Sequence, residues 1–123
     1  SYVPRINSFN LEVDNTLSPR PDATDASGYL GVLITDRTIK SSIDPEMVVV
    51  ATFDFHGNWF DDIINAFQTT VGATPGNIID FYANKFQIGG VSDDERDGTS
   101  VAGLELMFIT ANLGDDEVVI AFL

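Results

Sequence analysis

The sequence predicts a mainly β domain: a β-sandwich or barrel of about six to seven strands, with one packed α-helix at about residues 58–71. Several stretches alternate apolar and polar residues with period two, Gly, Pro and Asp clusters separate them, and a single stretch has helical spacing. The chain has 123 residues, enough for one domain with a real core. We therefore expect a single domain over residues 1–123.

The N-terminal half is predicted to hold three strands. Residues 9–15 alternate in polarity, residues 29–39 are rich in branched side chains, and residues 47–57 form a third apolar run that Gly57 closes. Residues 16–28 show no periodicity and contain two prolines, which predicts a loop long enough to be a functional arm. Asp44 before Pro45 predicts a turn.

The predicted helix follows the third strand. Asn58 is a candidate N-cap, Asp61 and Asp62 suit the positive N-terminal end of a helix, and Gly72 is the stop signal. One apolar face would contain Trp59, Phe60, Ile63, Ile64, Phe67 and Val71. This face is expected to anchor the core.

The C-terminal half is predicted to be strands again, which gives the order β-β-β-α-β-β-β. The alternation of residues 77–91 slips near Ala83 to Lys85, which indicates a bulge. Asp97-Gly98 is a hairpin turn signal. The strand after it would place Leu104, Leu106 and Phe108 on one face.

The chain ends on an apolar run. A turn at residues 114–117 leads into a last strand over residues 117–123, and Val118 to Leu123 are all apolar. A strand that is apolar on both faces needs cover on both faces. One side is expected to be the domain's own core, and the other is either the helix or a neighbouring subunit.

The composition excludes several classes of function. Nineteen acidic residues against six Lys and Arg give a net charge of −13, the wrong sign for binding nucleic acid by neutralising phosphates. The acidity fits ordinary solubility or a salt-adapted organism. With no cysteine there are no disulfides, thiolate nucleophiles or Cys-bound zinc. No apolar run is long enough for a membrane span, and no secretory leader is recognisable.

His56 is the one candidate for acid–base chemistry. It lies near Asp54, which could orient it as a general base, but no serine in a nucleophile elbow and no cysteine accompanies the pair. A histidine at a strand end beside a turn is the simpler interpretation. An enzyme is therefore the weakest class, and no catalytic residue is assigned.

Two acidic motifs suggest binding sites. Asp93, Glu95 and Asp97 before Gly98 resemble the first half of a calcium loop, but the twelfth position is Leu104. Asp61 and Asp62 resemble a glycosidase pair, and Trp59 beside them could stack on a sugar. Helix-dipole stabilisation explains the aspartates and core packing explains the tryptophan. We therefore predict no metal site and no cofactor-binding site.

Three patches taken together resemble the tail tube, or major tail, proteins of long-tailed bacteriophages and prophages. They are the stretch "FNLEVDNTL", the stretch "TDRTIKSSIDPEM", and the C-terminal run from Asn77 to Leu123 with its acidic Asp-Gly loop and its "GDDE" before an apolar end. The resemblance covers about two thirds of the chain. The chain is short for this family, so it is either a whole subunit or one domain of a longer polypeptide. The family's ring-stacking loop has only a modest counterpart in residues 16–28.

The resemblance implies a structural virion protein that is made in the host cytoplasm. Copies would join edge to edge into rings, the rings would stack into a tube, and the genome would pass through it. The implied partners are further copies and other virion proteins, with no specific DNA binding, no membrane, no catalysis and no cofactor. An acidic lumen would let DNA slide. The alternatives are a capsid decoration protein, a small carbohydrate- or calcium-binding β-sandwich module, or an enzyme that depends on His56.

Overall fold

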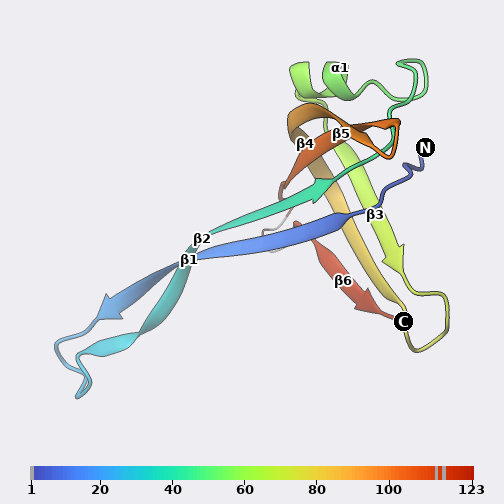
Figure 1. The fold of residues 1–123 in the computed structure, drawn as a ribbon. Coiled ribbons are helices and arrows are strands. Elements are labelled where there is room, and N and C mark those ends of the chain that lie inside the picture. The colour runs from blue at the N-terminus through green and yellow to red at the C-terminus, as the bar shows by residue number, and fades with distance from the viewer. Residues whose placement is uncertain (1, 113, 115) are drawn as a thin grey trace.

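The structure is a computed structural model, and it describes residues 2–112, 114 and 116–123. The described residues form six strands and one short helix (Figure 1). In chain order these are β1 (Phe9–Pro21), β2 (Tyr29–Ile43), α1 (Phe55–Phe60), β3 (Asn65–Val71), β4 (Ile79–Arg96), β5 (Thr99–Phe108) and β6 (Val119–Phe122). The mainly β class with a single helix is confirmed.

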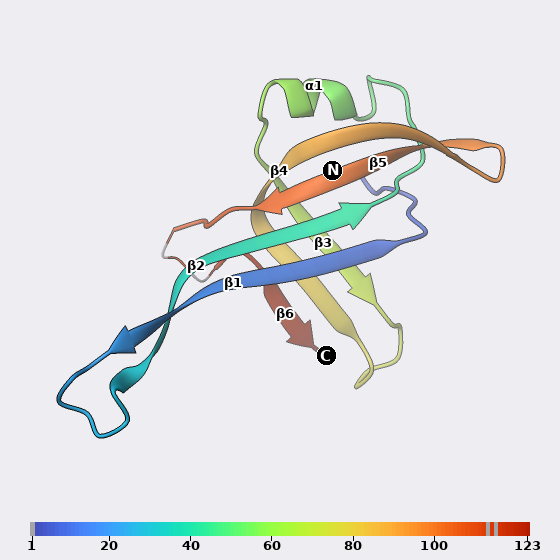
Figure 2. The same ribbon diagram turned by 60° about the vertical axis from the view of Figure 1, so that its left-hand side comes forward.

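All strands belong to one curled antiparallel sheet in the order β1-β2-β5-β4-β3 (Figure 2). The long strand β4 is its spine. The first half of β4 lies between β3 and β6, and its second half pairs with β5. Strand β6 therefore continues along the edge of β4 where β5 has left it.

The core lies on the concave side of this sheet. Alternate residues of β5 and β4 point into it, and α1 contributes Phe55. The buried apolar residues are Ile39, Ile43, Phe55, Ala83, Phe86, Ile88, Val101, Ala102, Leu104, Leu106 and Phe108. The prediction that Leu104, Leu106 and Phe108 share a buried face is confirmed. Phe9 stacks on Phe67 with ring centroids 5.8 Å apart, which closes the curled sheet on itself.

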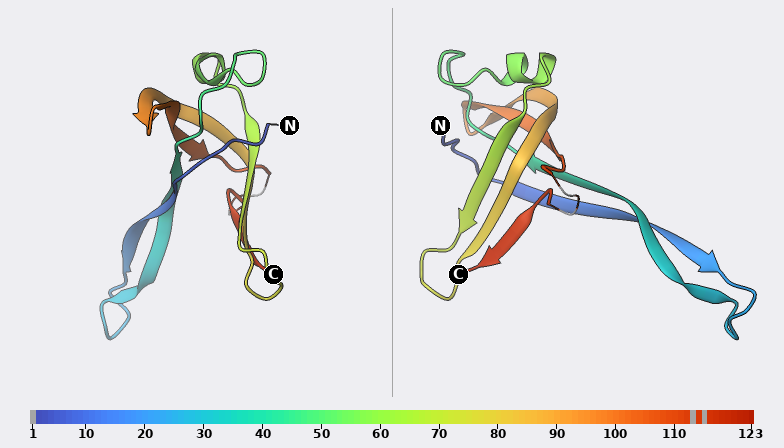
Figure 3. Two further views of the ribbon diagram at one scale, coloured as in Figure 1. Left: turned by 45° about the vertical axis from the view of Figure 1, so that its right-hand side comes forward. Right: turned by 180° about the vertical axis from the view of Figure 1, so that it is seen from behind.

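The first two strands form a hairpin that projects far beyond the body (Figures 1 and 3). The loop predicted for residues 16–28 is wrong in its first part, because β1 runs on to Pro21 and the turn occupies only residues 22–28. The two prolines hid the strand, since proline is normally rare within sheets. They are tolerated here because β1 is an edge strand. The expectation of an extended arm at this place fits the hairpin.

The predicted helix at about residues 58–71 is wrong in extent. Helix α1 has six residues, and Asp54 caps it, not Asn58. Asp61 and Asp62 follow the helix, and Asp62 has a positive φ of 51° that ends it. Residues 65–71 form β3. Phe67 and Val71 are four residues apart, which suits a helix, but they also lie on one side of a strand, and the observed pairing with β4 makes this segment a strand.

The third predicted strand, residues 47–57, is also absent. An isolated β-bridge joins Glu46, just before this segment, to Val101 of β5. Val49 and Val50 are exposed in a turn, and Phe55 begins α1. The apolar run thus supplies a loop that packs Phe53 and Phe55 onto the core, instead of a strand.

The C-terminal half matches the predictions more closely. Opposite the step from Asn65 to Phe67, β4 advances from Phe86 to Ala83, so it holds the extra residue of the predicted bulge. Asp97 and Gly98 both have positive φ, 49° and 81°, as a type I′ hairpin turn requires. The last strand is shorter than expected, and residues 113 and 115 of the predicted strand end and turn lie outside the described residues.

Candidate assembly surfaces

His56 does not form the pair with Asp54 that its sequence position suggested. The Asp54 Oδ1 atom accepts a hydrogen bond from the Gly57 N–H at 2.8 Å and so serves as the helix cap. His56 Nε2 instead lies 3.7 Å from Asp93 Oδ1, and both side chains are largely exposed. This exposed contact contributes little to stability, and it provides no enclosed site for acid–base chemistry.

The acidic residues of the two motifs lie in different elements, with Asp61 and Asp62 at the end of α1. Asp93 and Glu95 lie in β4, and Asp97 occupies the hairpin turn. Among residues 2–112, 114 and 116–123, no three His, Asp or Glu side chains are grouped as metal ligands. Trp59, expected in the core, is partly exposed and meets Phe60 edge to face, so it stands at the surface.

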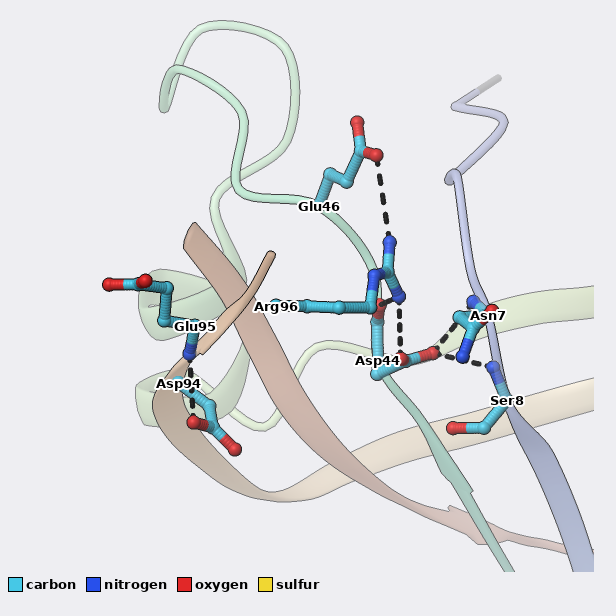
Figure 4. Close-up of polar contacts among 7 residues, drawn as sticks. All are labelled: Asn7, Ser8, Asp44, Glu46, Asp94, Glu95 and Arg96. Carbon is cyan, nitrogen blue, oxygen red and sulfur yellow. Dashed lines mark hydrogen bonds and ion pairs between the residues drawn. The ribbon is translucent and has the colours of Figure 1, made fainter. Parts of the chain in front are cut away.

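A polar cluster around Asp44 fastens the N-terminal segment to the body (Figure 4). Asp44 Oδ1 accepts the N–H groups of Asn7 and Ser8 at 2.9 and 2.8 Å, and Arg96 Nη1 donates to Asp44 Oδ2 at 2.6 Å. Arg96 Nη2 is 3.5 Å from Glu46 Oε1. The cluster ties together the chain before β1, the end of β2 and the tip of the β4–β5 hairpin.

The same contacts set the charge state of Asp44. Burial favours a higher pKa, but the hydrogen bonds from Ser8, Asn7 and Arg96 outweigh it and hold the pKa of Asp44 below its ordinary value. Asp44 is therefore ionised at neutral pH and acts as a structural carboxylate. Sequence reasoning placed a turn at Asp44 and missed this role, because its partners are 36 to 52 residues away.

The projecting hairpin has one apolar face. Residues directly opposite each other on two antiparallel strands lie on the same face, and here the opposite pairs include Val13 with Ile39, Leu17 with Ile34, and Pro19 with Val32. The other face carries mainly polar residues: Asp14, Thr16, Ser18, Arg20, Asp36 and Thr38, with Leu33 as the exception. The hairpin is therefore amphipathic, with the pair Asn15 and Arg37 as the polar exception on its apolar face.

This apolar face continues the core face of the domain. Strand β1 keeps the same two faces from Phe9 to Arg20, because the extra residue at the first register shift, Thr35, belongs to β2. The opposite pair Asn15 and Arg37 also lies on this face and separates its inner apolar residues from those of the distal hairpin. Phe9 and Ile39 pack in the core, whereas Leu17 and Val32 on the same face are each 62% exposed. Beyond the Asn15–Arg37 pair this face is apolar again, and no described residue of the chain covers it.

The root of the hairpin is attached to the segment that precedes β6. The Arg37 Nε–H donates to Asn15 Oδ1 at 3.1 Å, and Arg37 Nη1 lies 4.0 Å from Glu117 Oε2. These contacts join β1, β2 and the C-terminal segment at one place. They fix where the hairpin leaves the body.

The C-terminal strand is a second uncovered apolar surface. Ile120 and Phe122 point to one side of β6 and Val119 to the other, and all three are exposed, Phe122 at 78%. Helix α1 does not cover this strand, because it lies at the opposite end of the body (Figure 1). The sequence analysis expected either the helix or a neighbouring subunit to cover one face of this strand, and the expectation of the helix is wrong.

Comparison with known proteins gives one informative likeness. The whole chain superimposes on 85% of a chain from the tail of an empty GTA particle, a helically refined tail with C6 symmetry, with a TM-score of 0.63 and 12% sequence identity. This is a tail-related fold. At that identity the likeness extends to the fold alone, and it confirms the fold side of the predicted resemblance. No protein-family model and no curated protein matches the sequence.

The sequence contained a signal for the hairpin that the prolines concealed. Leu17, Pro19 and Pro21 alternate with Ser18 and Arg20, which is the pattern of a two-faced strand once proline is allowed at an edge. No membrane-spanning candidate emerges from the fold: helical structure in the described part of the chain is neither long nor apolar enough to cross a bilayer.

Proposed function

We propose that the chain is a structural subunit of a phage-type tail, whose copies associate into rings that stack into a tube for passage of the genome. The observation that carries this proposal is the uncovered apolar face of the β1–β2 hairpin. The tail-related fold supports it, since a chain of that fold is part of a C6-symmetric tail. The proposal involves no catalysis, cofactor or metal.

The hairpin face suits a protein contact more than any other use. Isolated exposed apolar residues are common on protein surfaces, but a continuous apolar patch marks an interaction site. Here Leu17, Val32 and Ile34 are exposed on the same side of a two-stranded ribbon. Such a ribbon is marginally stable alone in water and gains stability when its apolar face is covered.

A second copy is the partner that this proposal names. A contact between a hairpin on one copy and a different surface on the next is heterologous, and such contacts produce closed rings or open stacks. Both are needed for a tube. The net charge of −13 suits the inner wall, because carboxylates repel DNA phosphates and let the genome pass without sticking.

The test compares two single substitutions on the same hairpin. Leu17→Asp places a carboxylate on the apolar face, and Ser18→Asp places one on the opposite face at the next residue. We expect wild type and Ser18→Asp to form large assemblies on concentration, seen by light scattering and negative-stain images. We expect Leu17→Asp to remain a folded single subunit, because Leu17 is exposed in the free chain.

The outcomes separate the competing functions. A wild type that stays a single subunit at every concentration would contradict the proposal. Small closed oligomers that never stack, but bind to capsids, would favour the capsid decoration protein. A rise of several degrees in melting temperature with millimolar calcium would favour a calcium-binding module.

A further inference from the structure

Strand β6 has a free edge whose hydrogen-bonding groups can be assigned. Leu123 and Ile78 exchange both backbone hydrogen bonds, with N–H to O=C distances of 2.8 and 3.0 Å. Hydrogen-bonded and non-hydrogen-bonded pairs alternate along an antiparallel ladder. The N–H and C=O groups of Ile120 and Phe122, which lie opposite Phe81 and Ile79, therefore point away from β4 toward the free edge.

This edge lacks the protection that sheet edges usually carry. Strand β1 carries two prolines and the charged residues Glu12, Asp14 and Arg20, and β3 carries Gln68 and Thr70, which bind the Asp80 carboxylate. Strand β6 has no proline, no charged residue and no bulge. An unprotected apolar edge is a site where another strand can add.

Among the free edges of the described chain, the distal part of β2 is neutral and more apolar than the outer edge of β3, which carries Asn65, Gln68, Thr69 and Thr70. Strand β5 pairs with β2 at Ile39–Ile43 alone, so β2 has no neighbour beyond β1 from Tyr29 to Thr38. The first seven residues of that segment, "YLGVLIT", contain no proline and no charge. In a chain of net charge −13 two copies repel wherever carboxylates meet, so neutral edges are where they can approach.

We propose that the distal part of β2 in one copy adds to the free edge of β6 in a second copy and continues its sheet. The inference rests on the proposed function in so far as copies of the chain associate. The pairing is between copies, because the distal hairpin and β6 of one chain diverge from the body and end far apart (Figures 1 to 3). The added strand would also place cross-strand neighbours beside the exposed Ile120 and Phe122 side chains.

The first experiment removes one outward N–H group. Ile120→Pro deletes it and leaves the bonds of Val119, Ala121 and Leu123 to β4 in place, whereas Ile120→Ala shortens the side chain and keeps the N–H. We expect Ile120→Pro to raise the concentration needed for assembly by about ten-fold or more, the effect of about 1.4 kcal/mol. Ile120→Ala should stay within a few-fold of wild type, measured by sedimentation velocity.

The experiment distinguishes failure of this inference from failure of the proposed function. If Ile120→Pro assembles like Ile120→Ala, the β6 edge is not the docking site and this inference fails, although the proposed function stands. If wild type itself does not assemble, it is the proposed function that fails. Circular dichroism of both variants establishes that the subunit is folded.

A second experiment does not depend on the stability of a proline variant. The chain has no cysteine, so single-cysteine variants have no background. We expect Phe122→Cys mixed with Val32→Cys to form a disulfide-linked heterodimer under mild oxidation of the assembled protein. Phe122→Cys mixed with Val49→Cys, an exposed residue near α1, is the matched control. Equal cross-linking in both mixtures would overturn the inference. So would disulfide-linked homodimers of the Phe122→Cys variant with no heterodimer.

Discussion

Phe67 and Phe60 show how differently two residues of one predicted face are used. The sequence placed both on the same helix, yet Phe67 packs among Phe9, Phe86 and Phe108 with ring centroids 5.8, 6.1 and 5.9 Å away, while Phe60 is 85% exposed. We expect Phe67→Ala to lower the free energy of unfolding by about 3 kcal/mol, because it leaves a cavity among aromatic rings.

Phe60→Ala is the control for that measurement. It removes the same side chain from a surface position, so a change within about 0.5 kcal/mol is expected. Urea denaturation of the two variants gives both values. Equal losses of stability in the two variants would mean that Phe60 and Phe67 are buried alike. The longer helix predicted from the sequence would then be correct, and the separate α1 and β3 would be wrong.

Asp44 should make the folded chain less stable as pH falls into the acid range. Its pKa in the folded chain is held below the ordinary value, so its contribution is complete above the ordinary value of 3.8 and is lost as pH falls through the lower folded value. We expect Asp44→Asn to lower the free energy of unfolding by about 1.5 kcal/mol at pH 7, the low end of the range for hydrogen bonds to a charged group, because the Asp44 side chain is partly exposed. The gap to wild type should narrow below about pH 4.

Asp94 provides the matched carboxylate. Its side chain accepts only the N–H of the next residue, Glu95, at 2.8 Å, so it fastens no distant segment (Figure 4). Asp94→Asn should change the free energy of unfolding at pH 7 little. Thermal melts from pH 7 to pH 3, with hydrogen exchange of the Asn7 and Ser8 amides, measure both effects. A pH-independent loss in Asp44→Asn would contradict the assigned role.

At the scale of elements, the sequence predicts turns and buried strands better than edge segments. The Asp97-Gly98 turn, the bulge near Ala83 and the buried face of β5 are local patterns, and each is present in the structure. The sequence predictions are wrong where pairing with distant strands determines the secondary structure. Residues 65–71 fit both a helix and a strand, and the prolines of β1 are acceptable only because no strand pairs with its outer edge.

Two glycines in the connections between strands, Gly72 after β3 and Gly98 in the β4–β5 turn, should differ in the substitutions that they tolerate. Gly98 has a φ of +81° with open space where a Cβ would point, so Gly98→Ala carries backbone strain alone, about 1 kcal/mol. Gly72 has a φ of +100°, and a Cβ there would also collide with the Asn77 carbonyl oxygen. Gly72→Ala should therefore lose clearly more stability in urea denaturation. Equal losses would contradict the geometry of the β3–β4 connection.

At the scale of the whole molecule, the sequence predicts the class of fold but cannot locate the surfaces between copies. Period-two alternation reports which side of a strand is apolar, and it cannot distinguish cover by the same chain from cover by another. Phe9 and Leu17 have the same pattern in β1, yet the first packs in the core and the second is exposed. That difference arises because the β1–β2 hairpin extends beyond the rest of the domain. How far β1 and β2 stay paired beyond the register shift at Thr16 and Leu17 is set by their pairing in three dimensions.

The balance between charge and apolar contact leads to a prediction about salt. Each copy carries −13, so copies repel over a Debye length of about 30 Å at 0.01 M salt and about 3 Å at 1 M. If the contacts between copies are the neutral, apolar edges and faces described above, salt removes the repulsion and leaves the attraction intact. We expect assembly to begin at lower protein concentration as sodium chloride rises from 0.01 to 1 M, measured by light scattering. Leu17→Asp should stay dispersed throughout, because salt does not restore its lost apolar contact. Assemblies that dissolve as salt rises would instead mean that ion pairs hold the copies together, and the apolar hairpin face would lose its role.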